Sequence, residues 1–123
     1  MTKRLSAEKL LPTASKQMDR FHLSTVEEVA RAVEKEAIVV VGTAQNPFVR
    51  RARKALEAAG HPFTYLQYGS YLSGWKQRLA VKIWSGFPTF PQVYVRGRLL
   101  GGAQDVEKAL ADGSFKQALS AAP

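Results

Sequence analysis

The stretch "AIVVV" at residues 37–41 most constrains how this chain can fold. An unbroken apolar run that is mostly β-branched is typical of a short strand buried on both faces of its sheet. Such a strand needs a covering layer on each side. Apolar residues recur at helical intervals before it, in residues 24–36, and again after residue 46. The sequence therefore predicts an α/β protein built around a buried strand.

The helices on either side of this strand have recognisable start signals. Ser24 is followed three residues later by a glutamate, which is the spacing of a capping box at the start of the first helix. Asn46 is a good N-cap residue, and Pro47 suits the first position of the second helix. Gly60 follows the last residue of the apolar pattern and predicts the end of that helix.

The remaining elements complete a mixed sheet. Residues 62–68 are predicted to form a strand, residues 73–84 a helix, and residues 92–102 a hairpin with a tight connection at Arg96-Gly97. Two helical segments, "AQDVEKALADG" and "SFKQALSAA", follow. The early strand–helix–strand unit implies a parallel pair with a right-handed crossover, and the hairpin adds an antiparallel pair. We expect a four-stranded mixed sheet flanked by helices.

Composition fits one compact domain, since the chain has 123 residues of which 46% are hydrophobic. No apolar window is long enough for a transmembrane helix, and the first 20 residues contain no apolar segment of signal-peptide length. We therefore expect a cytoplasmic protein. Residues 1–20 are expected to be a loosely structured lead-in.

The chain is strongly basic, with a formal net charge of +8 and a pI near 10.1. Such a surface attracts acidic proteins, nucleic acid and small acids, although solvated basic helices are its ordinary explanation. Aromatic and basic residues interleave over 68–84, a mixture that can bind single-stranded nucleic acid but more often lines a core or groove. Nucleic acid and membrane are therefore not favoured as partners. The candidate docking face for an acidic protein comprises Arg50, Arg51, Arg53 and Lys54.

The element order and the stretch "FPTFPQVYVRGRLLGG" resemble the glutaredoxin family, and "FPTFPQVYV" is similar to its monothiol class. In that family, Thr89-Phe90-Pro91 would correspond to an element with a cis proline before a strand, and Gly101-Gly102 to the pair that ends the hairpin. The resemblance implies a thioredoxin-like fold.

The resemblance begins at about residue 37 and extends to about residue 119. It implies a glutaredoxin-like domain over residues 37–123. Residues 1–36 would then be an N-terminal extension that carries one extra helix.

The cysteines of the family are missing. Its Cys-Pro-Tyr-Cys motif falls on Asn46-Pro47-Phe48-Val49, and the chain contains 0 cysteines. The family mechanism needs a thiolate whose pKa is lowered at a helix N-terminus. An asparagine amide is neither a nucleophile nor a redox group. We therefore expect a pseudoenzyme, without the family's glutathione-dependent disulfide exchange or cluster carriage and without catalytic residues.

The resemblance also implies a glutathione groove. Thr43 stands where the family has a lysine for the glycine carboxylate, so that contact loses its charge. Arg78 matches an arginine that can approach the same carboxylate, and the backbone of Phe90 would pair with the ligand as an added strand. Asp105 would meet the γ-glutamyl end. Ligand binding is not the only explanation for these two residues. Arg78 can instead be an exposed arginine of a helix, and Asp105 can instead stabilise the start of a helix through the helix dipole. The full candidate set is Thr43, Asn46, Pro47, Phe48, Arg78, Thr89, Phe90, Pro91, Gly101, Gly102, Gln104 and Asp105.

Three functions stay open at this point. The first is a binding or regulatory module whose groove holds glutathione or a peptide segment. The second is a protein-interaction scaffold with a vestigial groove and a basic docking face. The third is a glutathione transfer in which Asn46 or Thr43 positions the ligand thiol, although no base for that thiol is evident. His22 and His61 stand alone, so no metal site is predicted.

Overall fold

The computed structural model describes residue 9 and the ranges 11–70 and 72–121. The helices and strands in chain order are α1 (Pro12–Arg20), α2 (Leu23–Lys35), β1 (Ile38–Gly42), α3 (Pro47–Ala58), β2 (Thr64–Gln67), α4 (Trp75–Ser85), β3 (Gln92–Val95), β4 (Arg98–Gly101), α5 (Ala103–Asp112) and α6 (Ser114–Ser120). The strands form one four-stranded sheet in the order β2-β1-β3-β4. Strand β1 pairs parallel with β2 and antiparallel with β3, and β3 pairs antiparallel with β4. The predicted mixed sheet is confirmed.

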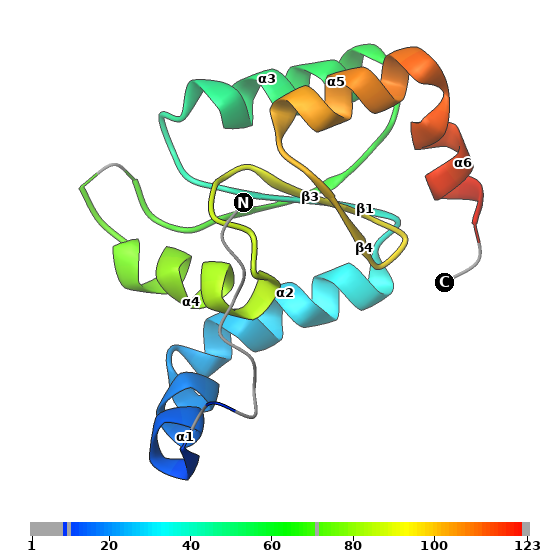
Figure 1. Ribbon diagram of the computed structural model, residues 1–123. Helices are drawn as coiled ribbons and strands as arrows, with labels where there is room; N and C mark the ends of the chain where they lie inside the picture. Colours follow the sequence, from blue (N-terminus) through cyan, green and yellow to red (C-terminus); the bar gives the residue numbers. More distant parts are fainter. Residues whose placement is uncertain (1–8, 10, 71, 122–123) are drawn as a thin grey trace.

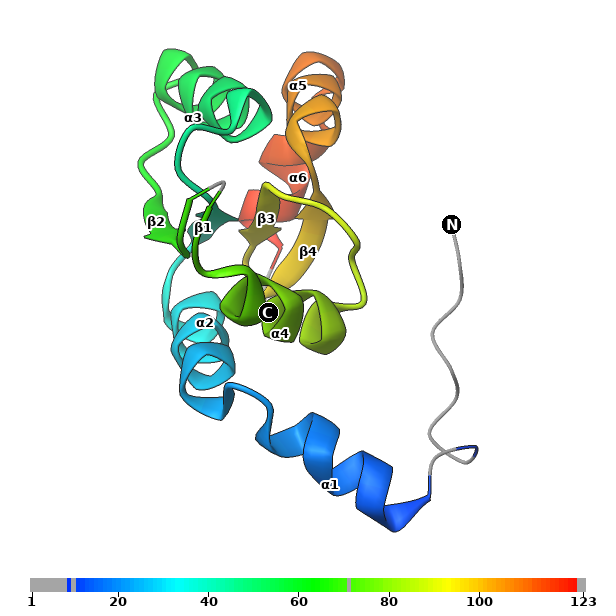
Figure 2. The same ribbon diagram turned by 90° about the vertical axis from the view of Figure 1, so that its left-hand side faces the viewer.

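Helices cover both faces of this sheet, with α3 and α5 on one side and α2 and α4 on the other (Figures 1 and 2). Side chains of a strand alternate between the two faces. Ile38 and Val40 therefore join the core under α3, α5 and α6, whereas Val39 and Val41 join the core over α2 and α4. The buried strand thus serves two separate cores, as its unbroken apolar sequence predicts.

The connections at the β3–β4 hairpin and at Pro91 match their predictions. Arg96 and Gly97 have positive φ angles of 49° and 82°, which is the geometry of a two-residue type I′ turn. The Phe90-Pro91 peptide bond is cis. Gly60, predicted to follow the second helix, has a φ of 76° just beyond α3.

Two expectations about the N-terminal part are wrong. Residues 12–20, expected to be loosely structured, form α1, which extends away from the other elements in both views (Figures 1 and 2). Proline at its first position and good helix formers after it favour a helix, but the segment lacks the apolar periodicity that would have signalled one. Ser24 does not cap α2. The N-cap is His22, whose φ of 46° turns the chain sharply after α1.

The N-terminal extension therefore holds two helices among its described residues instead of the one expected. Helix α2 is part of the folded body, because Val29 and Val33 are buried in the core with Val39 and Val41 of β1. The hydroxyl of Tyr68, after β2, also donates a hydrogen bond to Glu28 of α2. The boundary between residues 36 and 37 stays a prediction. Within the part of the chain described, no helix has the length and apolarity needed to cross a membrane.

The junction between β4 and α5 depends on Gly101. Its φ is 135°, which disfavours any residue with a Cβ, and a Cβ built there would collide with the carboxylate of Asp105. Gly102 is different. Its φ of −96° is ordinary, and the nearest atom to a Cβ there is the carbonyl oxygen of Pro91 at 3.7 Å.

The first prediction compares these two neighbours. Gly101→Ala should lower the free energy of unfolding by about 1–3 kcal/mol, because alanine would be strained at this φ. Gly102→Ala is the control and should change it by less than about 1 kcal/mol. Urea unfolding followed by circular dichroism measures both. Equal losses in the two variants would contradict this account of the junction.

Candidate functional site

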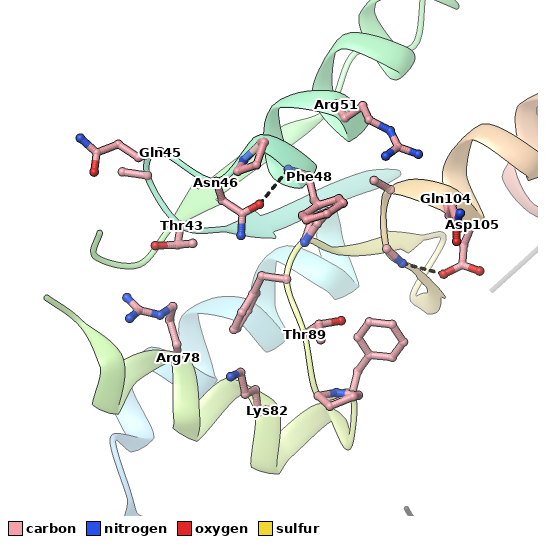
Figure 3. A pocket seen from close by; sticks show the side chains of 18 of the residues that line it. Thr43, Gln45, Asn46, Phe48, Arg51, Arg78, Lys82, Thr89, Gln104 and Asp105 are labelled. Carbon is pink, nitrogen blue, oxygen red and sulfur yellow. Dashed lines mark hydrogen bonds between the residues drawn. The ribbon is translucent and has the colours of Figure 1, made fainter. Parts of the chain in front are cut away.

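A groove of about 810 Å³ lies where the start of α3, one face of α4, the loop before β3 and the start of α5 meet (Figure 3). Its lining includes all of the predicted site residues except Gly101. The lining residues are Thr43, Ala44, Gln45, Asn46, Pro47, Phe48, Arg51, Ser70, Arg78, Lys82, Phe87, Pro88, Thr89, Phe90, Pro91, Gly102, Ala103, Gln104 and Asp105.

The side chain of Asn46 caps the start of α3, as predicted. Its Oδ1 accepts hydrogen bonds from the backbone N–H groups of Phe48 at 2.8 Å and Val49 at 3.1 Å. Without a cap, these two N–H groups would be open donors at the positive end of the helix dipole. The carboxamide oxygen therefore occupies the place at which the helix would stabilise an anionic atom. Val49, the other cysteine position in the resemblance, is 2% exposed and does not line the groove.

Helix α4 supplies the cationic wall. Arg78 and Lys82 are four residues apart and therefore lie on the same side of the helix (Figure 3). Nη1 of Arg78 donates to the carbonyl oxygens of Tyr68 at 3.1 Å and Ser73 at 2.6 Å, so this arginine also holds the loop before α4. Nζ of Lys82 lies 5.7 Å from the centre of the Phe90 ring. Thr43 contributes no charge, and its hydroxyl donates to the carbonyl of Gly69 at 3.2 Å.

The loop before β3 is held in place by a buried glutamine. Gln92 is fully buried, its Nε2 donates to the carbonyl of Phe87 at 3.1 Å, and its Oε1 accepts from the hydroxyl of Tyr94 at 2.8 Å. Burial raises the pKa of Tyr94 to about 12, so this donor keeps its proton throughout the neutral range. The network fixes the backbone on which Phe90 and Pro91 face the groove.

At the other end of the groove, Asp105 stabilises the start of α5. One oxygen of its carboxylate accepts a hydrogen bond from the N–H of Gly102 at 2.9 Å (Figure 3). This is the helix-start role that the sequence left open for Asp105, and among the described residues no hydrogen-bond partner is found for its second oxygen. Gly101 does not line the groove, because its contribution is the backbone turn that brings Asp105 into place.

Sequence reasoning missed several lining residues: Ala44, Gln45, Arg51, Ser70, Lys82, Phe87, Pro88 and Ala103. Lys82 is the most informative of them, because it brings a second cation, beside Arg78, to the wall of the groove formed by α4. Its spacing of four residues from Arg78 was the available signal. Among the described residues, no group of three or more metal-ligating side chains is found.

The basic face of α3 is less open than its sequence suggests. Arg51 forms a bidentate ion pair with Glu107 of α5, with Nε–Oε2 at 2.9 Å and Nη2–Oε1 at 2.5 Å. The guanidinium of Arg53 stacks 4.0 Å from the centre of the Tyr65 ring. Arg50 and Lys54 are exposed, so they are the two members of the predicted docking face that remain available to a partner.

The interleaved aromatic residues of 68–84 do not form one surface. Tyr68 is buried in the core under α2 and α4, and the Trp84 ring lies 6.0 Å from that of Tyr94. Trp75 is 59% exposed on α4, and Tyr71 lies outside the described residues. Of the described aromatics, Tyr68 takes the predicted core role, whereas Trp75 and Trp84 are exposed, and none of the three lines the groove.

No family model matches the chain, but its amino-acid sequence is similar to proteins with glutaredoxin names. A glutaredoxin-like protein of Dictyostelium discoideum is 42% identical over 114 residues, which are 93% of this chain and 93% of that protein. Glutaredoxin 4 of Buchnera aphidicola is 29% identical over 103 residues, 80% of this chain and 94% of that protein.

Solved structures similar to this fold carry the same family name. The buckwheat glutaredoxin–glutathione complex has a TM-score of 0.70 and 20% identity, and the match covers 85% of this chain and 92% of that one. Oxidized glutaredoxin 2 from Chlamydomonas reinhardtii has a TM-score of 0.68 and 21% identity, with 79% and 92% covered. The thioredoxin-like fold is confirmed.

The second prediction concerns the ion pair that ties α3 to α5. Hydrogen bonds from Arg51 hold the pKa of Glu107 below its usual range. A lowered folded-state pKa adds stability above the unfolded pKa of about 4.3, and this is lost as pH falls through the folded value. Glu107→Gln should therefore melt below the wild type at pH 7, and the difference should close in acid. Thermal unfolding between neutral and acidic pH measures it.

Glu57→Gln is the matched control, because Glu57 is an exposed glutamate of α3 with no ion pair among the described residues. The melting temperature of Glu57→Gln should differ less from that of the wild type at pH 7 than the melting temperature of Glu107→Gln does. If the difference in melting temperature between Glu107→Gln and the wild type stays constant down to pH values below about 3, the assigned ion pair is contradicted.

Proposed function

This chain belongs to the glutaredoxin family, and we propose that it is a member that binds glutathione reversibly without thiol–disulfide exchange. A peptide segment with the same end groups could occupy the same groove. We place the protein in the cytoplasm, where glutathione is abundant. The observation that carries the proposal is the groove, which keeps recognition groups for a small peptide acid while Asn46 replaces the nucleophile.

The charges along the groove match those of a tripeptide with two carboxylates and one amino group. Lys82 and the part of Arg78 not bonded to its loop can take the glycine carboxylate. At the other end, the N–H groups at the start of α5 suit the γ-glutamyl carboxylate, and the second oxygen of Asp105 suits the amino group. The ends of the groove thus differ in the groups they bind, which fixes one orientation of the ligand.

The backbone of Phe90 supports binding between these ends. It lies outside the β-ladder, and no hydrogen bond to its N–H or carbonyl is found within the described part of the chain. An extended ligand can therefore pair with it as a short added strand. This contact depends on the loop that Gln92 fixes, and not on the identity of any cysteine.

The loss of exchange chemistry follows from Asn46. Attack on a disulfide requires a thiolate, and a chain with 0 cysteines cannot form one. A related fold supports the binding half of the proposal, because one of the similar structures is a buckwheat glutaredoxin in complex with glutathione. Ligand binding and disulfide exchange are separable because binding uses the walls of the groove, whereas exchange needs a thiolate at position 46.

The alternative function is a scaffold that binds an acidic protein through α3. The available cations for it are Arg50 and Lys54, since Arg51 is paired with Glu107 and Arg53 is stacked on Tyr65. Two exposed cations are weak support compared with a groove whose charges are arranged along its length. We therefore favour the ligand-binding function.

The third prediction is that glutathione binds in the groove. A titration followed by backbone NMR should shift the amides of Thr89, Phe90 and residues 102–105. Lys82→Ala should weaken binding by about tenfold or more, because it removes a charge-assisted hydrogen bond.

Lys54→Ala is the charge-matched control and should leave the dissociation constant unchanged, because Lys54 lies on α3 outside the groove. The proposal is wrong if millimolar glutathione shifts no groove amide, and the scaffold then becomes the better function. Equal weakening by the two variants would also contradict it, because long-range attraction alone would then explain binding.

A further inference from the structure

We propose that Asn46 makes this groove selective for glutathione whose sulfur is uncharged, as a thiol or thioether, and selective against an anionic sulfur group. The inference rests on the proposed function and concerns the position next to α3. In the proposed pose, the central residue of the ligand pairs with Phe90, so its side chain reaches across the groove to Asn46 and Pro47.

The two backbone donors at this position are already used. Oδ1 of Asn46 lies 2.8 Å from the amide nitrogen of Phe48 and 3.1 Å from that of Val49. An oxygen or sulfur anion stabilised by the helix start would have to occupy the same place. The asparagine thus acts as a built-in neutral substitute for that anion.

What Asn46 offers the ligand is its amide nitrogen, which faces away from α3 toward the α4 side of the groove (Figure 3). Among the described residues, no acceptor is found for this NH₂ group. A thiol or thioether sulfur has a lone pair that can accept weakly from it, and neither needs the backbone donors. A neutral sulfur is therefore accommodated at no electrostatic cost.

Nearby cations do not restore an anion site at this position. Arg51 is neutralised by its bidentate pair with Glu107. In the proposed function Lys82 and the free part of Arg78 hold the glycine carboxylate, and Nη1 of Arg78 is bonded to two loop carbonyls. The general positive charge of the groove attracts every anionic ligand, so it acts against the proposed selectivity and makes the test stringent.

The test compares glutathione, S-methylglutathione and glutathione sulfonate by calorimetry at neutral pH. For the wild type we expect the first two dissociation constants to agree within about threefold and the sulfonate to bind about tenfold more weakly. In Asn46→Gly the two amides are exposed, and glycine is the mildest replacement at an N-cap. The sulfonate should then gain about tenfold relative to S-methylglutathione.

Gln45→Gly is the matched control. Gln45 lines the same groove next to Asn46 and has a φ of 63°, which glycine adopts without strain, but its replacement uncovers no helix amide. It should leave the sulfonate ratio unchanged. Equal or tighter binding of the sulfonate by the wild type overturns the inference, as does an unchanged ratio in Asn46→Gly.

If none of the three compounds binds the wild type, the proposed function fails, and a second measurement decides the inference. Sulfate is titrated into the ligand-free wild type and Asn46→Gly while the amide signals of Phe48 and Val49 are followed by NMR. The inference predicts shifts in the glycine variant alone. Shifts in the wild type, or in neither protein, overturn it.

Discussion

The pair of hydrogen bonds from the first amides of α3 to Asn46 determines what the start of this helix can bind and activate. A helix that begins at the edge of a sheet needs acceptors for its first N–H groups. Here a neutral side chain from the preceding residue supplies them. The N–H groups that could lower the pKa of a thiol are therefore already bonded within the protein. The start of α3 stabilises the fold without activating a nucleophile.

The groove survives because its other walls do not depend on that position. The cationic wall is set by helical spacing on α4, and the loop that presents Phe90 is fixed by the buried side chain of Gln92. The far end is set by the turn at Gly101, which brings Asp105 against the start of α5. Each wall is therefore held by contacts within the fold that are separate from the Asn46 cap.

Much of the fold was predictable because its signals are local. The β-branched run of β1, the Asn46-Pro47 helix start and the Arg96-Gly97 turn each encode their structure within a few residues. Helix α1 was missed because it packs little and so lacks an apolar pattern. Lys82 was missed although its spacing from Arg78 indicates a shared face of α4, whereas the Arg51–Glu107 pair could not be predicted because α3 and α5 meet only in the folded chain.

The central claim is that the site keeps its geometry and has lost only its reactive atom, and Asn46→Cys tests it most directly. The thiolate absorbance of this variant gives the thiol pKa. We predict a thiol pKa well below the ordinary value of about 8.5, in the range of about 3.5–7.5 that helix N-termini produce. A thiol pKa of about 8.5 or higher would show that position 46 is not the place of the lost thiolate.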